Sequence, residues 1–318
     1  MKHKTSITII ILSMFLITQF IGLLVIHAYS PISQTIVNPQ TGETEKLSIP
    51  QELPFGFSAD EEAKPGLFSI IFSFIIAITL ISILIRYKWK SAIRIWFFAV
   101  TVIALAITLN ALLKISFTNS SLISLAIALP FGFLKVFRPS MIIHNATELL
   151  IYPGISVIFI PLLNFWTIII LLIIISIYDM WAVWHSGIMQ KMAKFQMEEL
   201  KVFGGFFIPY IPKELKAKIK KLKNSKSKSI SKKEKEKNKK IKVNLAILGG
   251  GDVVFPLITA GVFLRAFGLI PALLVIAGAF AGLLFLLVSS EKKKFYPAMP
   301  FITVGIFLGI IISWLFFM

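Results

Sequence analysis

Long apolar stretches recur along the whole chain and constrain its fold more than any other feature. Because a helix rises 1.5 Å per residue, about 20 apolar residues are needed to cross roughly 30 Å of hydrocarbon. Nine stretches have about this length, and they cover residues 6–27, 66–85, 92–113, 121–136, 141–161, 164–184, 243–264, 269–288 and 296–317. With 57% hydrophobic residues, the 318-residue chain has more apolar surface than one soluble core can bury. The sequence therefore predicts an all-α integral membrane protein with nine transmembrane helices.

The positive residues predict the orientation of these helices. If the nine spans alternate in direction, 29 of the 33 lysines and arginines lie on the side of the N-terminus and four lie on the other side, beside an acidic first loop. Because loops rich in lysine and arginine stay in the cytoplasm, we expect a multi-pass protein of the cell membrane with its N-terminus cytoplasmic and its C-terminus outside. The first stretch is longer than the apolar core of a usual signal sequence, so we expect it to remain as a helix.

One cytoplasmic loop holds much of the charge, since 18 of the 33 positive residues lie between Lys191 and Lys242. Residues 188–203 alternate apolar and charged side chains and predict an amphipathic extension of the sixth helix, whereas the lysine-rich remainder is typical of disorder. The loop thus divides the chain into a six-helix unit (1–186), a partly disordered cytoplasmic loop (187–241) and a three-helix unit (242–318). Anionic lipid is the partner that such a loop favours; nucleic acid is not expected, because no basic fold with interleaved aromatic residues accompanies it.

Residue types exclude several kinds of chemistry. The chain has no cysteine, and its four histidines are scattered without the spacing of metal ligands. Thiolate catalysis and a cysteine-based metal site are therefore excluded, and we expect neither a metal nor a cofactor.

Three acidic residues lie inside the predicted spans: Glu148, Asp179 and Asp252. An ionisable group in the hydrocarbon is costly and by default marks a functional site, although a helix-end side chain, a helix–helix hydrogen bond or an ion relay are alternatives. By helix rise, Asp179 lies roughly 8–10 Å from the cytoplasmic end of the sixth span, and Asp252 lies roughly 14 Å into the seventh. Consecutive antiparallel helices would thus carry one aspartate each at similar depth.

Two carboxyl groups a few ångströms apart at low dielectric cannot both ionise, so they share a proton. The ionised group can take a proton from water as the water attacks a peptide carbonyl, while the protonated group donates to the carbonyl oxygen and later to the leaving nitrogen. The same pair could also relay protons or bind a cation. Asp179 and Asp252 are therefore the candidate catalytic residues, and peptide hydrolysis is one of the functions that they allow.

Short motifs accompany the two aspartates. They are Tyr178 before Asp179, the glycines Gly249, Gly250 and Gly251 before Asp252, and Pro297, Ala298, Met299 and Pro300 at the start of the last predicted span. The tyrosine offers a hydrogen-bond donor, the glycines allow close backbone approach or close helix packing, and the two prolines prevent an ordinary first helical turn. Each motif is weak alone.

Together and in this order, the motifs resemble those of the presenilin/signal peptide peptidase family of intramembrane aspartyl (GxGD) proteases. The resemblance implies a presenilin-type fold in which six helices surround the last three, with Asp179 and Asp252 facing each other across a water-accessible cavity. It also implies that the proline motif holds the backbone of a transmembrane substrate. The compact chain further favours an archaeal homologue.

Two positions differ from the family pattern. Met299 replaces the usual leucine, a volume-conserving change that we expect to be tolerated. Pro256 resembles the signal peptide peptidase branch, whereas a cytoplasmic N-terminus resembles presenilin, so the branch and the accepted substrate orientation stay open. The orientation itself predicts substrates with their N-termini outside.

The sequence thus predicts an intramembrane aspartyl endopeptidase acting on transmembrane segments. A helical substrate must be unwound before water can attack it, and strand-like pairing with the enzyme backbone would satisfy the freed groups. The alternatives are a prepilin-type GxGD peptidase and an ion- or proton-conducting protein that uses the same acids. For Glu148 we expect a structural pair with His144, one helical turn away, with a role near the aspartates as the alternative.

Overall fold

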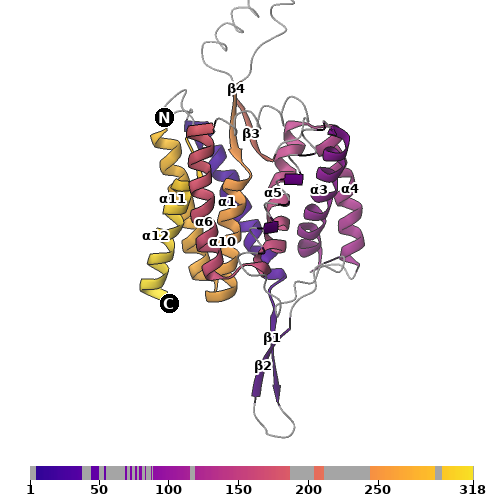
Figure 1. Ribbon diagram of the computed structural model, residues 1–318. Coiled ribbons are helices and arrows are strands. Elements are labelled where there is room, and N and C mark those ends of the chain that lie inside the picture. The colour runs from indigo at the N-terminus through magenta and orange to yellow at the C-terminus, as the bar shows by residue number, and fades with distance from the viewer. Residues whose placement is uncertain are drawn as a thin grey trace, which may run out of the picture.

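The computed structural model describes residues 5–37, 44–49, 89–114, 119–186, 204–210, 244–290 and 296–317, with isolated positions between 54 and 87. These residues form a bundle of long helices with one small hairpin at each end (Figure 1). The helices are α1 (Thr5–Ala28), α3 (Lys90–Leu113), α4 (Ser120–Phe137), α5 (Met141–Phe159), α6 (Phe165–Trp181), α10 (Gly251–Phe267), α11 (Leu269–Ser289) and α12 (Met299–Phe317). Short 3₁₀ and π segments, Ile160–Leu162 and Ala182–Ser186, extend α5 and α6.

Local sequence explains several helix ends. The side chain of Ser140 accepts a hydrogen bond from the backbone N–H of Ile143 at the start of α5, and Asn164 does the same for Thr167 at the start of α6. Both are N-caps, which satisfy amides that have no partner inside the helix. Gly268, with a φ of +93°, is the single residue between α10 and α11, a conformation that favours glycine.

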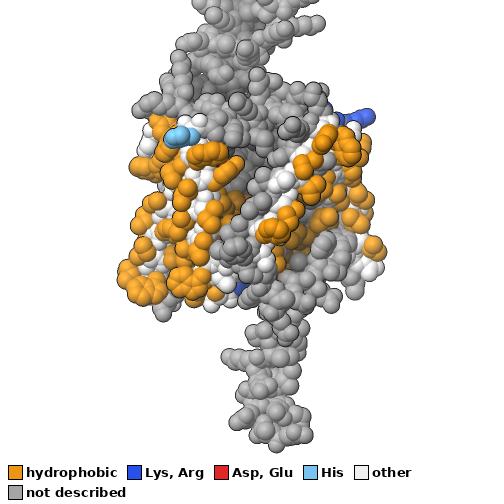
Figure 2. Space-filling model, viewed as in Figure 1, with side chains coloured by type: hydrophobic (Ala, Val, Ile, Leu, Met, Phe, Trp, Pro, Cys, Tyr) orange, Lys and Arg blue, Asp and Glu red, His pale blue; other side chains and the backbone are white. Residues whose placement is uncertain are grey.

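The outer faces of the bundle are apolar. Figure 2 shows hydrophobic side chains covering the outward surfaces of the described helices on both sides of this view. Large side chains such as Trp166, Ile142 and Trp314 are more than two-thirds exposed, as expected where lipid replaces water. Seven of the described helices are long and apolar enough to cross a membrane.

The prediction of nine spans is matched in part. The stretch 66–85 lies outside the described residues apart from isolated positions, and α10, with 17 residues, is shorter than each of the seven once α6 is counted with its π extension. Nine helices and the direction of insertion therefore stay predictions. In Figure 1, α1 begins at the end of the bundle that carries strands β3 and β4, whereas α12 ends at the opposite end.

The all-α prediction is wrong in one respect, since the described residues also form two antiparallel hairpins. One pairs β1 (Ile32–Val37) with β2 (Thr44–Ile49), and the other pairs β3 (Gly205–Tyr210) with β4 (Asn244–Gly249). The prediction of a helix beginning at residue 243 is therefore also wrong, because residues 244–249 are a strand and the helix begins only at Gly251. Pairing with β3, about 39 positions earlier in the chain, competes successfully with helix formation here, next to three consecutive glycines.

The second hairpin also changes the predicted cytoplasmic loop. β3 lies within the range 187–241, where the sequence predicts only an amphipathic helix and disorder. The amphipathic segment 188–203 and the lysine-rich residues 211–242 lie outside the described residues. The three-part division of the chain stays a prediction, and β3 ties its middle part to β4 of the C-terminal part.

Candidate active site

Asp179 lies in the last turn of α6, with 8% of its surface exposed. Its Oδ2 atom accepts a hydrogen bond from the backbone N–H of Met299 at 3.0 Å, and the N–H of Ala298 adds another. These two amides stand at the N-terminus of α12, where the first N–H groups of a helix lack partners inside it and favour a negative charge. The proline motif thus holds the carboxylate of Asp179 through its backbone.

Asp252 lies in the first turn of α10 and is half-buried. Its carboxylate accepts a hydrogen bond from the backbone N–H of Gly249, the last residue of β4, and the charge of Asp179 acts on it. The glycine motif is therefore a connection from strand to helix: Gly249 ends β4, Gly250 follows, and Gly251 begins α10. The sequence predicted Asp252 roughly 14 Å inside its helix. Because α10 begins only at Gly251, Asp252 lies at the beginning of the helix instead.

Polar side chains hold the surrounding helices in register. α6 packs against α10 and α12, and the hydroxyl of Ser176 donates to that of Thr303 at 2.8 Å, one turn from the contact between Asp179 and Met299. On α1, the fully buried Gln19 donates from Nε2 to the carbonyl oxygen of Val253 at 2.9 Å. These residues carry no charge, so the acids inside the predicted spans do not point to them. Uncharged polar residues inside an apolar span are the signal that would have found them.

Tyr178 lies elsewhere than the motif suggested. Its side chain is 59% exposed, and its ring lies beside that of Trp181, 6.3 Å between centroids. A different tyrosine, Tyr152 of α5, packs under the glycine connection: a Cβ atom on Gly250 would lie 3.0 Å from its hydroxyl oxygen. Sequence spacing alone gives no sign of this contact.

The third intramembrane acid, Glu148, belongs to a different cluster. Its carboxylate forms an ion pair with Lys135 of α4, and the two side chains are 1% and 2% exposed. His144 Nε2 is 3.7 Å from the same carboxylate oxygen, so the expected His144–Glu148 proximity is present, but lysine is the nearer partner. Lys135 ends the predicted span 121–136, where the sequence predicts a cation on the cytoplasmic side, whereas the structure buries it beside Glu148.

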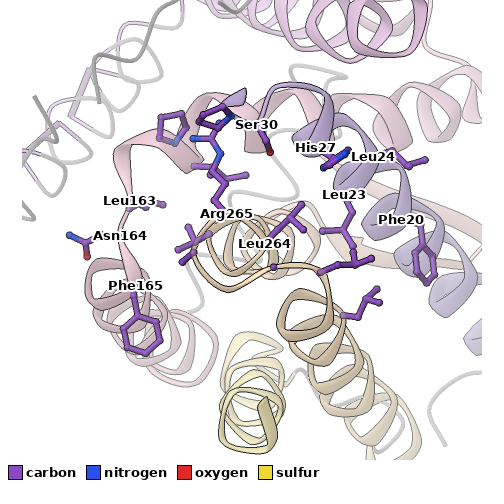
Figure 3. Close-up of a pocket in the computed structure, with 18 residues that line it drawn as sticks. Phe20, Leu23, Leu24, His27, Ser30, Leu163, Asn164, Phe165, Leu264 and Arg265 are labelled. Atoms are coloured by element: carbon purple, nitrogen blue, oxygen red, sulfur yellow. The ribbon is translucent and has the colours of Figure 1, made fainter. Parts of the chain in front are cut away.

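A cavity of about 990 Å³ lies at the far end of α1 and α10 from the aspartates. Figure 3 shows Phe20, Leu24 and His27 of α1 facing the end of α10, where Arg265 and Leu264 lie. Arg265 follows Asp252 by thirteen residues, roughly 20 Å along a helix. This cavity is therefore separate from the candidate active site.

Asp179 and Asp252 lie on helices that pack against each other, and the charge of Asp179 acts on Asp252, so the two acids define the candidate site. The described residues contain no cluster of three or more histidine, cysteine or acidic side chains that could hold a metal ion. The molecule belongs to the class of multi-pass helical membrane proteins with a carboxylate pair inside the bundle.

Among the solved structures that share this fold are two structures of a presenilin family intramembrane aspartate protease, one in space group C222 and one in P2. The first is 16% identical, covers 97% of this chain and 98% of its own, and has a TM-score of 0.56. The second is 18% identical, covers 96% of each chain, and has a TM-score of 0.54. No curated protein matches the sequence.

The family follows from the sequence profile described as signal-peptide peptidase, presenilin aspartyl protease, which matches residues 49–318. The chain belongs to this family, and it is a multi-pass membrane protein. The predicted family resemblance is confirmed; archaeal origin stays a prediction.

Proposed function

We propose that this protein is an intramembrane aspartyl endopeptidase that hydrolyses peptide bonds within transmembrane segments, with Asp179 and Asp252 as general acid and base. The observation that carries the proposal is that Asp179 is held by two backbone amides of the proline motif and Asp252 by one amide of the glycine motif, while the charge of Asp179 acts on Asp252. Membership of an aspartyl protease family supports it.

The chemistry needs one proton shared by the pair. The ionised carboxylate removes a proton from water as the water oxygen bonds to the substrate carbonyl carbon, and the protonated carboxyl gives its proton to the carbonyl oxygen. In the second step the carbon–nitrogen bond breaks: the protonated carboxyl gives its proton to the nitrogen, one hydroxyl of the diol intermediate gives its proton to the other carboxylate, and an acid and an amine leave. Proton sharing is restored, so no cofactor enters the balance.

Substrate backbone is held, in this proposal, by the outer edge of β4, with which no described strand pairs. Its chain runs towards the bundle and ends at Gly249, whose N–H contacts the Asp252 carboxylate (Figure 1). An unwound segment paired with this edge would have its backbone groups satisfied and one peptide bond beside the aspartates. If the N-terminus is cytoplasmic, β4 runs from the cytoplasmic side into the membrane. A substrate whose N-terminus is outside runs the other way, so it would pair with β4 in the antiparallel direction.

The test is cleavage of a model transmembrane peptide by the purified full chain in lipid vesicles, with mass spectrometry of the products. We expect cuts inside the apolar segment, loss of cleavage in Asp179→Asn and in Asp252→Asn, and inhibition by a transition-state mimic of aspartyl proteases. Cuts outside the membrane at a charged leader would indicate the prepilin-type alternative. Aspartate-dependent ion flux without any proteolysis would indicate the conducting alternative.

A further inference from the structure

The two-stranded sheet of β3 and β4 has two outer edges, and backbone geometry shows which groups face them. The N–H of Gly250 donates to the carbonyl oxygen of Gly204 at 3.3 Å, directly beyond the paired residues Gly205 and Gly249. In antiparallel pairs, hydrogen-bonded and non-hydrogen-bonded positions alternate. The backbone groups of Gly205, Phe207 and Pro209 in β3 therefore point away from β4.

Side chains of α5 occupy this outer edge of β3. Asn145 donates from Nδ2 to the carbonyl oxygen of Phe207 at 2.7 Å and accepts from the Phe207 N–H at 2.9 Å. His144 Nε2 lies 2.7 Å from the carbonyl oxygen of Gly205, and since that oxygen only accepts, Nε2 carries the proton. The histidine ring also packs on that of Phe207, 4.8 Å between centroids.

Pro209 also makes the outer edge of β3 a poor place for an added strand, because proline has no N–H to donate. The primary amide of Asn145 presents one donor and one acceptor to Phe207, as the peptide group of a third strand would. Along this edge, α5 engages the outward carbonyl of Gly205 and both outward groups of Phe207, and Pro209 lacks its donor.

The outer edge of β4 differs. The same alternation turns the backbone groups of Ile247 and Gly249 away from β3. The Gly249 N–H bonds the Asp252 carboxylate, and within the described part of the chain no hydrogen-bond partner faces the outward groups of Ile247. The side chain of Ile247 is 40% exposed.

We propose that His144, Asn145 and Pro209 close the outer edge of β3, so that an unwound substrate can add only to β4, the edge that ends at Asp252. This rests on the proposed function. Strands lie 4.7–4.9 Å apart, so a substrate on the wrong edge would be displaced by three spacings, about 14 Å. No peptide bond in that position could reach the aspartates, and binding there would be unproductive.

Asn145→Ala in the full chain tests the closure through a kinetic pattern. Opening the edge at Phe207 adds an unproductive binding mode, which lowers kcat and KM by the same factor and leaves kcat/KM unchanged. We expect both to fall about threefold to tenfold, the worth of one or two net hydrogen bonds. A fall in kcat/KM with KM unchanged would overturn the proposal, because it would mean that Asn145 only supports the fold.

Asn164→Ala is the matched control. Asn164 also makes two hydrogen bonds through its side chain, both to Thr167 at 2.8 Å, but at the start of α6, away from the sheet. We expect it to leave the ratio of kcat to KM and both separate values unchanged for the folded enzyme. An equal fall of kcat and KM in this control would show that the pattern does not report on the β3 edge.

Disulfide cross-linking tests the closure of the β3 edge without turnover. Because the chain has no native cysteine, each introduced cysteine is the only one in the enzyme. In the Asp252→Asn background, a substrate with one cysteine should form a disulfide with Ile247→Cys whether or not Asn145 is present, because facing Cβ atoms of paired strands lie about 4.5–5.5 Å apart. Phe207→Cys should react only when combined with Asn145→Ala. Reaction at Phe207→Cys with Asn145 intact would overturn the closure.

The two proposals fail differently. If the enzyme is not an aspartyl protease, cleavage is absent or independent of Asp179 and Asp252. If only the edge closure is wrong, cleavage still depends on both aspartates while Asn145→Ala shows the wrong kinetic pattern or Phe207→Cys reacts with Asn145 in place.

Discussion

Two regions of the bundle bury carboxylates in different ways. On α4 and α5, Glu148 is neutralised by Lys135, with His144 close by, and both members of the ion pair are almost fully buried. On α6 and α10, the carboxylates of Asp179 and Asp252 accept hydrogen bonds from backbone amides, and no ion pair within the described residues involves either of them.

The partners of a buried acid distinguish a structural role from a catalytic one better than the rarity of acids inside apolar spans does. All three acids are unusual inside apolar spans, and depth alone would keep Glu148 among the candidates. A carboxylate paired with lysine has its charge balanced and tends to stay ionised, whereas two carboxylates with only each other and backbone donors can exchange a proton. We therefore expect the aspartate pair (Asp179 and Asp252) to matter for turnover and the ion pair (Lys135 and Glu148) to matter for folding.

The largest expected effect is the loss of turnover when either aspartate loses its ability to exchange a proton. Asp179→Asn or Asp252→Asn keeps shape and removes only that ability, so cleavage should fall by about 10⁴-fold, the upper range for general acid–base catalysis. Cleavage rates of a transmembrane peptide in vesicles, corrected for the folded fraction, measure this. Removing the whole ion pair with Lys135→Met and Glu148→Leu together should keep cleavage within about threefold of the native rate. A loss of similar size in this double variant would erase the distinction between the regions.

The second effect concerns stability, which should depend on the ion pair and hardly on the aspartate pair. Lys135→Met alone or Glu148→Leu alone leaves an unpaired buried charge and should reduce the unfolding free energy by about 3–5 kcal/mol, whereas both changes together should cost little. Unfolding of the purified protein in micelles with increasing denaturing detergent gives these values. Asp252→Asn should change stability far less than either single variant. If both single variants were neutral, the ion pair would have no role in the fold.

A pair of close helix contacts gives the third and smaller effect. A Cβ atom at Gly154 of α5 would meet the carbonyl oxygen of Ala104 in α3, and one at Gly282 of α11 would meet that of Phe301 in α12. Either glycine changed to alanine should cost about 1–3 kcal/mol of stability through overpacking. Only Gly282→Ala should also slow the folded enzyme, by about tenfold, because Phe301 is two residues from Met299 and shifts of 1 Å are costly at a reacting centre. Equal cleavage by both folded variants would contradict this.

The candidate acids and motifs could be recognised from the sequence because each depends on residues that are close together in the chain. The apolar stretches, the exclusion of cysteine chemistry and the order of the motifs all depend on residues near each other in the chain. The family prediction that follows from them is confirmed by the match to residues 49–318. The contacts that the motifs make could not be predicted in the same way. Met299 holds Asp179 through a backbone N–H, and no pattern of side chains indicates such a bond.

Contacts between distant segments could not be predicted from one sequence. The strand 244–249 is apolar enough to continue the following helix, and only its pairing with residues 205–210 decides its conformation. Lys135 could be assigned to Glu148 only with the rotation of α4 against α5, which apolar periodicity does not give when most faces are apolar. The hydrogen bond between Ser176 and Thr303 is equally hidden in one sequence, because it depends on the two residues facing each other across two helices.

The smallest effect tests whether such a pair serves the aspartates. Ser176→Ala and Thr303→Val remove the hydrogen bond between α6 and α12, and a double-mutant cycle should give a coupling of about 0.6 kcal/mol, typical of hydrogen bonds between membrane helices. Since the bond lies one turn from the contact between Asp179 and Met299, cleavage by the folded enzyme should fall about threefold, the rate equivalent of that energy.

The other region offers the matched comparison for this bond. Thr108 of α3 donates from its hydroxyl to the carbonyl oxygen of Leu150 in α5 at 2.6 Å and is fully buried. Thr108→Val should lower the unfolding free energy by a similar amount without changing cleavage by the folded enzyme, because this bond holds helices that carry neither aspartate. If Thr108→Val slowed cleavage as much as Ser176→Ala, helix register throughout the bundle, rather than the local support of Asp179, would control turnover.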